Sequence, residues 1–179
     1  MRNDPEKDIS ITNLVAAIFF WLLTAGWIAL IFFLSNESGD LSSDRSNAIL
    51  KTIELLFGEG VITDYILRKI AHVLEFSVLT VLTFIAIRFT NKVSEIRSYA
   101  ESPVKFIKSD NEMYIAISLW LSLLTAVVDE YHQLFVEGRD GSIKDVLIDS
   151  IGIFSVLLII RVGFSIYLRY LGAKEVRYE

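Results

Sequence analysis

The sequence predicts an all-α polytopic membrane protein: a bundle of four transmembrane helices, with a short interfacial helix as a candidate fifth element. Three observations favour this fold class. Hydrophobic residues make up 53% of the 179 residues, and the mean hydropathy is +0.50. Four separate windows are also apolar over about 20 residues or more, which is the length that crosses a bilayer. The chain length suits a single domain over residues 1–179.

The four predicted spans cover residues 12–34, 66–89, 113–136 and 145–168. The first runs from Thr12 to Leu34 without a charged residue, and acidic residues precede it. The apolar region of a secretory signal peptide is shorter, about 7–15 residues, and follows a basic segment. We therefore expect the first window to be a true span.

The connection between the first two spans carries a weaker helical pattern. Apolar residues recur there at helical spacing, after the candidate N-caps Ser42 and Ser43: Ile49, Ile53, Leu56 and Phe57. Such a helix either lies in the membrane interface or packs over the end of the bundle, and we favour the packing role. The second connection, residues 91–112, is polar and is expected to be a cytoplasmic loop.

Basic residues predict the orientation, because Lys and Arg in short connections are retained on the cytoplasmic side. They concentrate in the second connection and near both termini: Arg2, Lys7, Arg88, Lys92, Arg97, Lys105, Lys108, Arg169, Lys174 and Arg177. The first connection is acidic and contains Arg45 and Lys51 as its basic residues. We therefore expect both termini in the cytoplasm and the first and third connections outside.

Composition excludes several classes of chemistry. The chain has no cysteine, so it has no disulfide framework, thiolate zinc site or cysteine nucleophile. A net charge of −5 argues against a wide nucleic-acid interface. Neither a serine nucleophile elbow nor a P-loop or dinucleotide fingerprint is present.

Three polar clusters lie at the predicted outer ends of the spans, where charged groups are costly unless they pair or face water. The clusters are Arg68, Lys69, His72 and Glu75; then Asp129, Glu130, His132 and Gln133; then Arg139, Asp145 and Asp149. Because all three share one membrane face, we predict that they line a cavity that opens to the outside.

Helical periodicity supports this convergence. Arg68, His72 and Glu75 fall within about 60° of one another around a helix. Glu75 then lies about 10 Å deeper than Arg68, at a rise of about 1.5 Å per residue. Asp145, Asp149 and Gly152 form a matching stripe on the fourth span, and Gly152 lacks the bulk that would keep two helices apart.

Several segments together resemble the VanZ-like family of membrane proteins. They are Phe33 to Asn36 (FLSN), Arg68 to Phe76 (RKIAHVLEF), Asp129 to Phe135 (DEYHQLF), Gly138-Arg139, and Asp145 to Gly152 (DVLIDSIG). The resemblance implies a small helical protein of the bacterial cell membrane. It also implies a link to glycopeptide susceptibility, since the founding member is associated with low-level resistance to teicoplanin, but it implies no particular reaction. The family motifs map onto Lys69, His72, Glu75, Asp129, Glu130, Gln133, Arg139, Asp145 and Gly152.

Two functional hypotheses follow. In the first, the cavity binds an anionic lipid head group or a cell-wall precursor, because Arg forks match the geometry of phosphate and carboxylate. The candidate binding residues are Arg68, Lys69, Gln133, Arg139, Asp145 and Asp149. In the second, the protein is a hydrolase or transferase acting on a lipid-linked or glycan substrate at the outer leaflet. Glu75 or Asp129 would be the general base and His72 an acid or base, with Glu130 as a further catalytic candidate.

Two further readings concern the same residues. The polar groups could instead form a network of ion pairs and hydrogen bonds that fixes helix register. We predict no cofactor; the alternative is a metal held by His72, Glu75, Asp129 and Asp149, since His and Glu three residues apart occur in metal sites of helical bundles.

The expected partners are membrane lipids and a lipid-linked cell-wall precursor or glycopeptide, with no nucleic acid.

Overall fold

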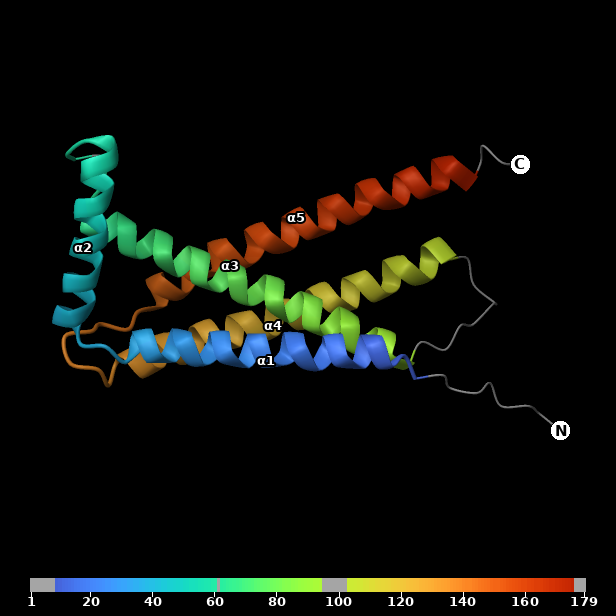
Figure 1. Ribbon diagram of the computed structural model, residues 1–179, viewed down its shortest axis with the longest axis horizontal. Helices are drawn as coiled ribbons and strands as arrows, with labels where there is room; N and C mark the ends of the chain where they lie inside the picture. Colours follow the sequence, from blue (N-terminus) through green and yellow to red (C-terminus); the bar gives the residue numbers. More distant parts are fainter. Residues whose placement is uncertain (1–8, 61, 95–102, 176–179) are drawn as a thin grey trace.

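The computed structural model describes residues 9–60, 62–94 and 103–175, and these contain five α-helices and one short 3-10 helix (Figure 1). The elements are α1 (Ile11–Ser35), α2 (Gly39–Phe57), α3 (Asp64–Asn91), η1 (Lys92–Ser94), α4 (Pro103–Gln133) and α5 (Ile143–Glu175). Four helical segments are long and apolar enough to cross a membrane: Ile11–Ser35, Asp64–Asn91, Asp110–Gln133 and Ile143–Tyr170. This confirms the predicted fold class.

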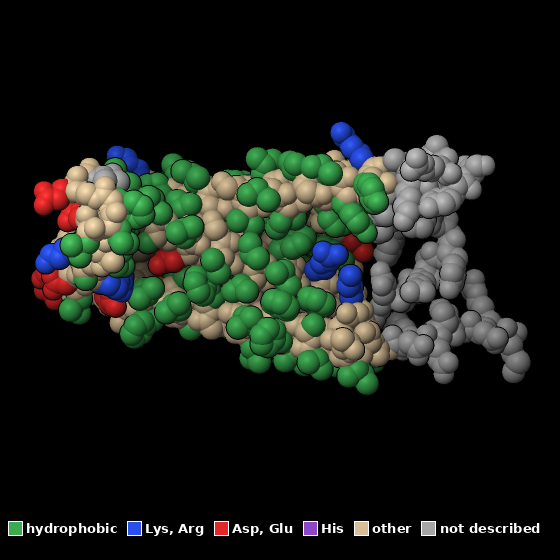
Figure 2. All heavy atoms as spheres, turned by 45° about the horizontal axis from the view of Figure 1, so that its top comes forward, with side chains coloured by type: hydrophobic (Ala, Val, Ile, Leu, Met, Phe, Trp, Pro, Cys, Tyr) green, Lys and Arg blue, Asp and Glu red, His purple; other side chains and the backbone are tan. Residues whose placement is uncertain are grey.

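The four long helices run along the long axis of the molecule, and α2 lies across one end of them (Figure 1). The first and third connections meet at this α2 end, whereas α1 begins and α5 ends at the opposite end. On the face shown in Figure 2, hydrophobic side chains cover the middle, and charged side chains gather towards the ends. Trp120, within the third apolar span, is 74% exposed, as expected for a lipid-facing residue.

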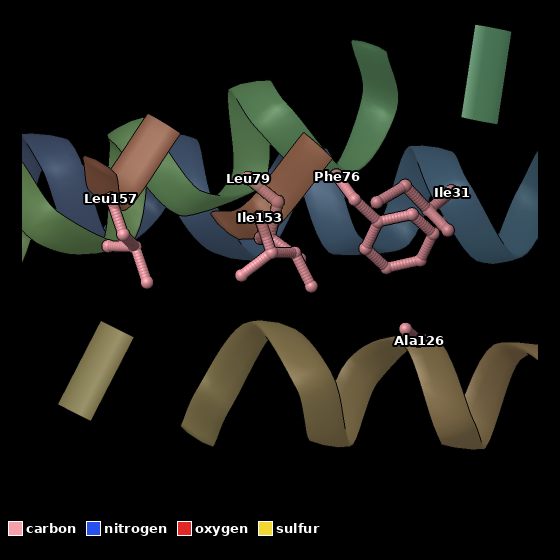
Figure 3. Packing of buried hydrophobic residues seen from close by; sticks show 6 residues of the cluster. All are labelled: Ile31, Phe76, Leu79, Ala126, Ile153 and Leu157. Atoms are coloured by element: carbon pink, nitrogen blue, oxygen red, sulfur yellow. The ribbon is translucent and has the colours of Figure 1, made fainter. Parts of the chain in front are cut away.

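Helix α3 is the centre of the bundle, because it packs against α1, α2, α4 and α5. The main buried cluster joins residues from all four long helices: Ile31, Phe76, Leu79, Ala126, Ile153 and Leu157 (Figure 3). Burial of these side chains fixes which faces of α3 and α5 point inward. The polar stripes of both helices begin one or two turns away, at the α2 end.

Helices α3 and α5 approach closely at Gly152. A Cβ atom at this position would lie 2.2 Å from the backbone oxygen of Val73, a distance that real contacts do not reach. The absence of a side chain therefore allows the contact, as predicted for this glycine. The approach also sets the register between the two stripes, since His72 precedes Val73 and Asp149 lies three residues before Gly152.

The start of α2 differs from the prediction. Ser38 is the N-cap, and its hydroxyl accepts a hydrogen bond from the Leu41 amide, so the predicted caps Ser42 and Ser43 are wrong. The helix starts early because Gly39 is held against the α4–α5 loop: its amide donates to the Glu137 carbonyl over 3.0 Å. Ser42 instead lies inside the helix and is buried.

The other connections also differ from the predicted bounds. Helix α4 ends at Gln133, so the predicted span to residue 136 is three residues too long. The Phe135 and Val136 amides bond to carbonyls three residues back, in turns, before Gly138 reverses the chain at a φ of 70°. In the predicted loop over residues 91–112, the part from Pro103 is helical, and residues 95–102 lie outside the described residues.

Candidate functional site

A small open cavity of about 50 Å³ lies at the α2 end of the bundle. Helices α1, α2, α3 and α4 and the α4–α5 loop each contribute to its walls. Its polar lining consists of Ser35, Ser42, Arg45, Arg68, His72, Glu75, Asp129 and Arg139. Each of the three predicted clusters therefore contributes at least one residue to the lining of this cavity.

The α3 stripe forms one wall of this cavity. Arg68, His72 and Glu75 all line it, as expected from their common helical face. The indole Nε1 of Trp27 donates to the backbone oxygen of Glu75 over 2.9 Å, which ties α1 to α3 beside the site. Trp27 is thus a packing residue that holds this wall in place.

Three arginines from separate parts of the chain surround the cavity. Arg139, in the α4–α5 loop, donates from Nε to the Glu37 carbonyl (3.1 Å) and from Nη2 to the Leu34 carbonyl (3.0 Å). Burial lowers the pKa of the Arg139 guanidinium from its ordinary value, and the nearby cations Arg68 and Arg45 lower this pKa further. The mutual repulsion of these cations makes the site receptive to an anion.

Arg139 also completes the end of α1. The last carbonyls of a helix have no partner within it, and the carbonyls of Leu34 and Glu37 lie at this end. Arg45 on α2 pairs with the Glu37 carboxylate, so two arginines are fixed around the same turn.

The last turn of α4 presents a hydrogen-bonded acidic cluster. Asp129, Glu130 and Gln133 are all buried. Gln133 Nε2 donates to Asp129 Oδ2 (3.0 Å) and to Glu130 Oε1 (3.2 Å), and the Ser142 amide donates to Glu130 Oε2 (2.9 Å). Gln133 therefore orients both carboxylates rather than lining the first cavity itself.

His72 and Asp149 face each other where α3 and α5 approach. His72 Nδ1 lies 3.4 Å from Asp149 Oδ1, and Asp149 is completely buried. Glu130 joins them: one potential ligand atom from each of His72, Glu130 and Asp149 lies within 4.8 Å of the others. Among the described residues, the metal-type cluster thus contains Glu130 in place of the predicted Glu75 and Asp129.

Lys69 and Asp145 form an ion pair at the edge of the site, joining α3 to the start of α5. Both line an adjoining cavity together with Arg68, His72, Gln133 and Arg139. Because Lys69 and Asp145 neutralise each other, Lys69 contributes less positive charge to the site than an unpaired lysine would.

Three polar residues of the lining are not among the predicted site residues: Ser35, Ser42 and Arg45. Ser35 lies in the segment that carried the family resemblance, and Arg45 is a basic residue in an otherwise acidic connection, so both had a visible signal. His132 departs from its cluster: its ring lies 5.9 Å from that of Phe32, and it lines neither cavity described above.

Fold and site together define a multi-pass membrane protein with four apolar helices and a polar cavity at one end of the bundle. The family model described as VanZ/LLP1 matches residues 20–166, and the chain belongs to this family. The match confirms the resemblance and includes every cavity residue named above. No curated protein and no solved structure matches the chain.

Proposed function

We propose that the cavity binds the phosphate-bearing head group of an anionic lipid or of a lipid-linked cell-wall precursor. The observation that carries this proposal is the convergence of Arg68 and Arg139 on one cavity, with Arg45, which is also paired with Glu37, in the same lining. Guanidinium groups bind phosphate oxygens in pairs and stay charged at all physiological pH values. The cavity lies at one end of the apolar helices, which is the level at which lipid head groups lie.

The cavity lining carries charges of both signs. Arg45, Arg68 and Arg139 are its cations, and Glu75 and Asp129 are its carboxylates. The hydroxyls of Ser35 and Ser42 add neutral hydrogen-bonding groups. A ligand with an anionic group and a polar, hydrogen-bond-donating part, such as a glycerol or sugar phosphate, complements this mixed lining.

A binding measurement on purified protein in nanodiscs tests the proposal. We expect phosphatidylglycerol or a polyprenyl diphosphate to bind and phosphatidylcholine not to bind, with the preference between the first two identifying the source of the phosphate. Arg68→Gln is expected to weaken binding about 10- to 100-fold, because a hydrogen bond to a charged group contributes about 1.5–3 kcal/mol. Arg88→Gln, on the same helix but exposed at the opposite end, is the matched control. Equal binding by both variants would contradict the proposal.

The binding site is proposed to face outside, at the surface of a bacterial cell, with both termini in the cytoplasm. The excess of Lys and Arg in the second connection and at the termini supports this orientation. Since the chain has no cysteine, Glu137→Cys at the α2 end and Tyr170→Cys at the other end are clean probes. An impermeant thiol reagent should label the first in intact cells and the second after lysis; the reverse pattern would place the site inside.

A second candidate function is catalysis on the same class of ligand, as a hydrolase or transferase. The observation that favours it is the position of His72 beside Glu75 and Asp129 in the cavity lining, where acid and base groups can act on a bound head group. Turnover of lipid-linked substrates that disappears in Glu75→Gln would establish an enzyme. Arginine-dependent binding without turnover would establish a binding protein.

A consequence at the level of the cell is proposed from family membership: lower susceptibility to teicoplanin-type glycopeptides. The test expresses wild type, Glu75→Gln and Asp129→Asn at matched membrane abundance in a sensitive Gram-positive host, and measures teicoplanin and vancomycin susceptibility. Protection by wild type that both variants lose would link the cavity to resistance. Cells that all behave like the empty-vector control would rule out this role.

A further inference from the structure

We infer that His72, Glu130 and Asp149 form a binding site for a divalent transition-metal ion, of the Zn²⁺ or Mn²⁺ type, beside the cavity. The three residues come from α3, α4 and α5, and one potential ligand atom of each lies within 4.8 Å of the other two. None of these ligands is an arginine, so metal binding at this site does not depend on the proposed head-group binding.

The distance between His72 and Asp149 fits ligands of a common ion. Their Nδ1 and Oδ1 atoms are 3.4 Å apart, and neither atom has a hydrogen bond of normal geometry among the described residues. Nitrogen and oxygen ligands lie about 2.0–2.2 Å from Zn²⁺, so two of them in a tetrahedral site are separated by about 3.4 Å. The pair is therefore spaced as two ligands are, and an oxygen of Glu130 lies within 4.8 Å of both.

Asp149 provides an independent argument. Its side chain is 0% exposed, and within the described part of the chain neither of its oxygens accepts a hydrogen bond. A buried carboxylate is very costly unless a cation or several donors compensate it. An ion between Asp149, Glu130 and His72 supplies that compensation.

Carboxylates outnumber basic groups around the three proposed ligands, which favours binding of a cation. Glu75 faces the site from α3, Asp129 and Glu130 from α4, and Asp149 from α5, whereas His72 is the titratable base among them. Two of the nearby permanent cations are paired with other carboxylates: Lys69 with Asp145, and Arg45 with Glu37. Arg68 lies at the mouth of the cavity, about one helical turn from His72.

Hydrogen bonds orient the Glu130 carboxylate in the way that is usual for a metal ligand. Its Oε1 accepts from Gln133 and its Oε2 from the Ser142 amide, so the carboxylate is held in one orientation. Ligands in metal sites are commonly oriented in this way by hydrogen bonds from a surrounding set of groups. Gln133 additionally binds Asp129, which places a further carboxylate next to the three ligands.

The ligand set defines the class of metal. One imidazole and two carboxylates suit Zn²⁺ or Mn²⁺ better than Mg²⁺ or Ca²⁺, which prefer oxygen alone. Three protein ligands leave at least one position open for water or an anionic oxygen. Because His72 also lines both cavities, the site borders the space that the arginines line.

Metal titration of purified, chelator-stripped protein in detergent tests the inference. We expect one Zn²⁺ or Mn²⁺ per chain by elemental analysis, together with a rise of several degrees in melting temperature on adding the metal. Asp149→Asn and Glu130→Gln should each weaken the metal affinity by at least 100-fold. Glu112→Gln is the matched control, because Glu112 also lies on α4 but pairs with Arg161 on a different part of the molecule.

The melting temperature separates loss of metal from loss of fold. Asp149→Asn removes a buried charge without changing the shape of the side chain. In chelator it should therefore melt at or above the temperature of wild type, and metal should raise this temperature no further. Wild type that melts cooperatively but binds no stoichiometric Zn²⁺ or Mn²⁺ would overturn the inference. So would stoichiometric binding with unchanged affinity in both variants.

Discussion

The middle of the bundle and its α2 end both bury polar side chains, but they satisfy them differently. In the middle, the hydroxyls of Thr80, Thr83 and Ser118 donate to backbone carbonyls four residues earlier on their own helices, over 2.7–2.8 Å. At the α2 end, Asp149 is equally buried, but among the described residues neither of its oxygens accepts a hydrogen bond of normal geometry, and His72 Nδ1 lies 3.4 Å away. The same protein thus contains one polar layer that is complete and one that is incomplete.

This difference distinguishes polar groups that serve the fold from polar groups that are available for function. A hydroxyl that bonds to its own helix needs no partner from elsewhere and adds little net energy. Buried carboxylates without donors carry a cost that the fold alone does not compensate. An incomplete polar layer beside a cavity is therefore expected where a ligand or ion completes it, and the predictions below test this contrast.

The largest effect is expected at the contact that builds the incomplete layer. In Gly152→Ala, the new Cβ atom would lie 2.2 Å from the Val73 carbonyl oxygen, so α3 and α5 must separate. We expect a loss of about 2–3 kcal/mol in the free energy of unfolding, as for overpacked sites. Head-group and metal binding should fall with it. Thermal and denaturant unfolding of the purified protein measure the loss.

Gly163→Ala on the same helix is the control for this prediction. No atom lies within 4 Å of a Cβ built at Gly163, so the substitution should be neutral or should stabilise the helix by about 0.5–1 kcal/mol. Equal destabilisation by both variants would show that helix approach does not position the site.

The second largest effect is expected for Arg139→Gln. The shorter side chain cannot reach the carbonyls of both Leu34 and Glu37, to which Arg139 now donates. We expect a loss of about 1–2 kcal/mol in unfolding free energy, since the Glu37 carbonyl loses its Arg139 donor while the Leu34 carbonyl still accepts from the Glu37 amide over 3.4 Å. Arg139→Lys should recover part of the stability but less of the phosphate binding, because Lys does not offer a planar fork. Parallel unfolding and binding measurements separate the two effects.

A smaller effect is expected at the rim, where Lys69 and Asp145 are paired and partly exposed. In a double-mutant cycle of Lys69→Met and Asp145→Asn, we expect a coupling energy of about 0.5–1 kcal/mol in unfolding free energy. Raising the salt concentration should reduce this coupling, because water reaches both side chains. A coupling energy above about 3 kcal/mol would instead place the pair among the buried, structural ion pairs.

Periodicity predicted the parts of this site that lie on regular helices. Arg68, His72 and Glu75 share one face in the sequence and line one cavity in the structure. What could not be predicted comes from contacts between distant segments. Arg45 lines the cavity because Gly39 binds the α4–α5 loop and brings α2 across the bundle end. Glu130 lies with His72 and Asp149 because its carboxylate is held by Gln133 and Ser142.

The smallest effect is expected in the complete layer. Thr80→Val removes a hydroxyl that bonds to the Phe76 carbonyl (2.7 Å) and lies 3.1 Å from the Ser122 hydroxyl. Polar contacts between membrane helices contribute about 0.6 kcal/mol on average. Ser122 can also turn to its own helix, as Ser118 does. We therefore expect the unfolding free energy to change by about 0.6 kcal/mol or less, with head-group and metal binding unchanged. A loss of head-group or metal binding in Thr80→Val would mean that the two polar layers are coupled, because the substitution alters no residue of the cavity itself.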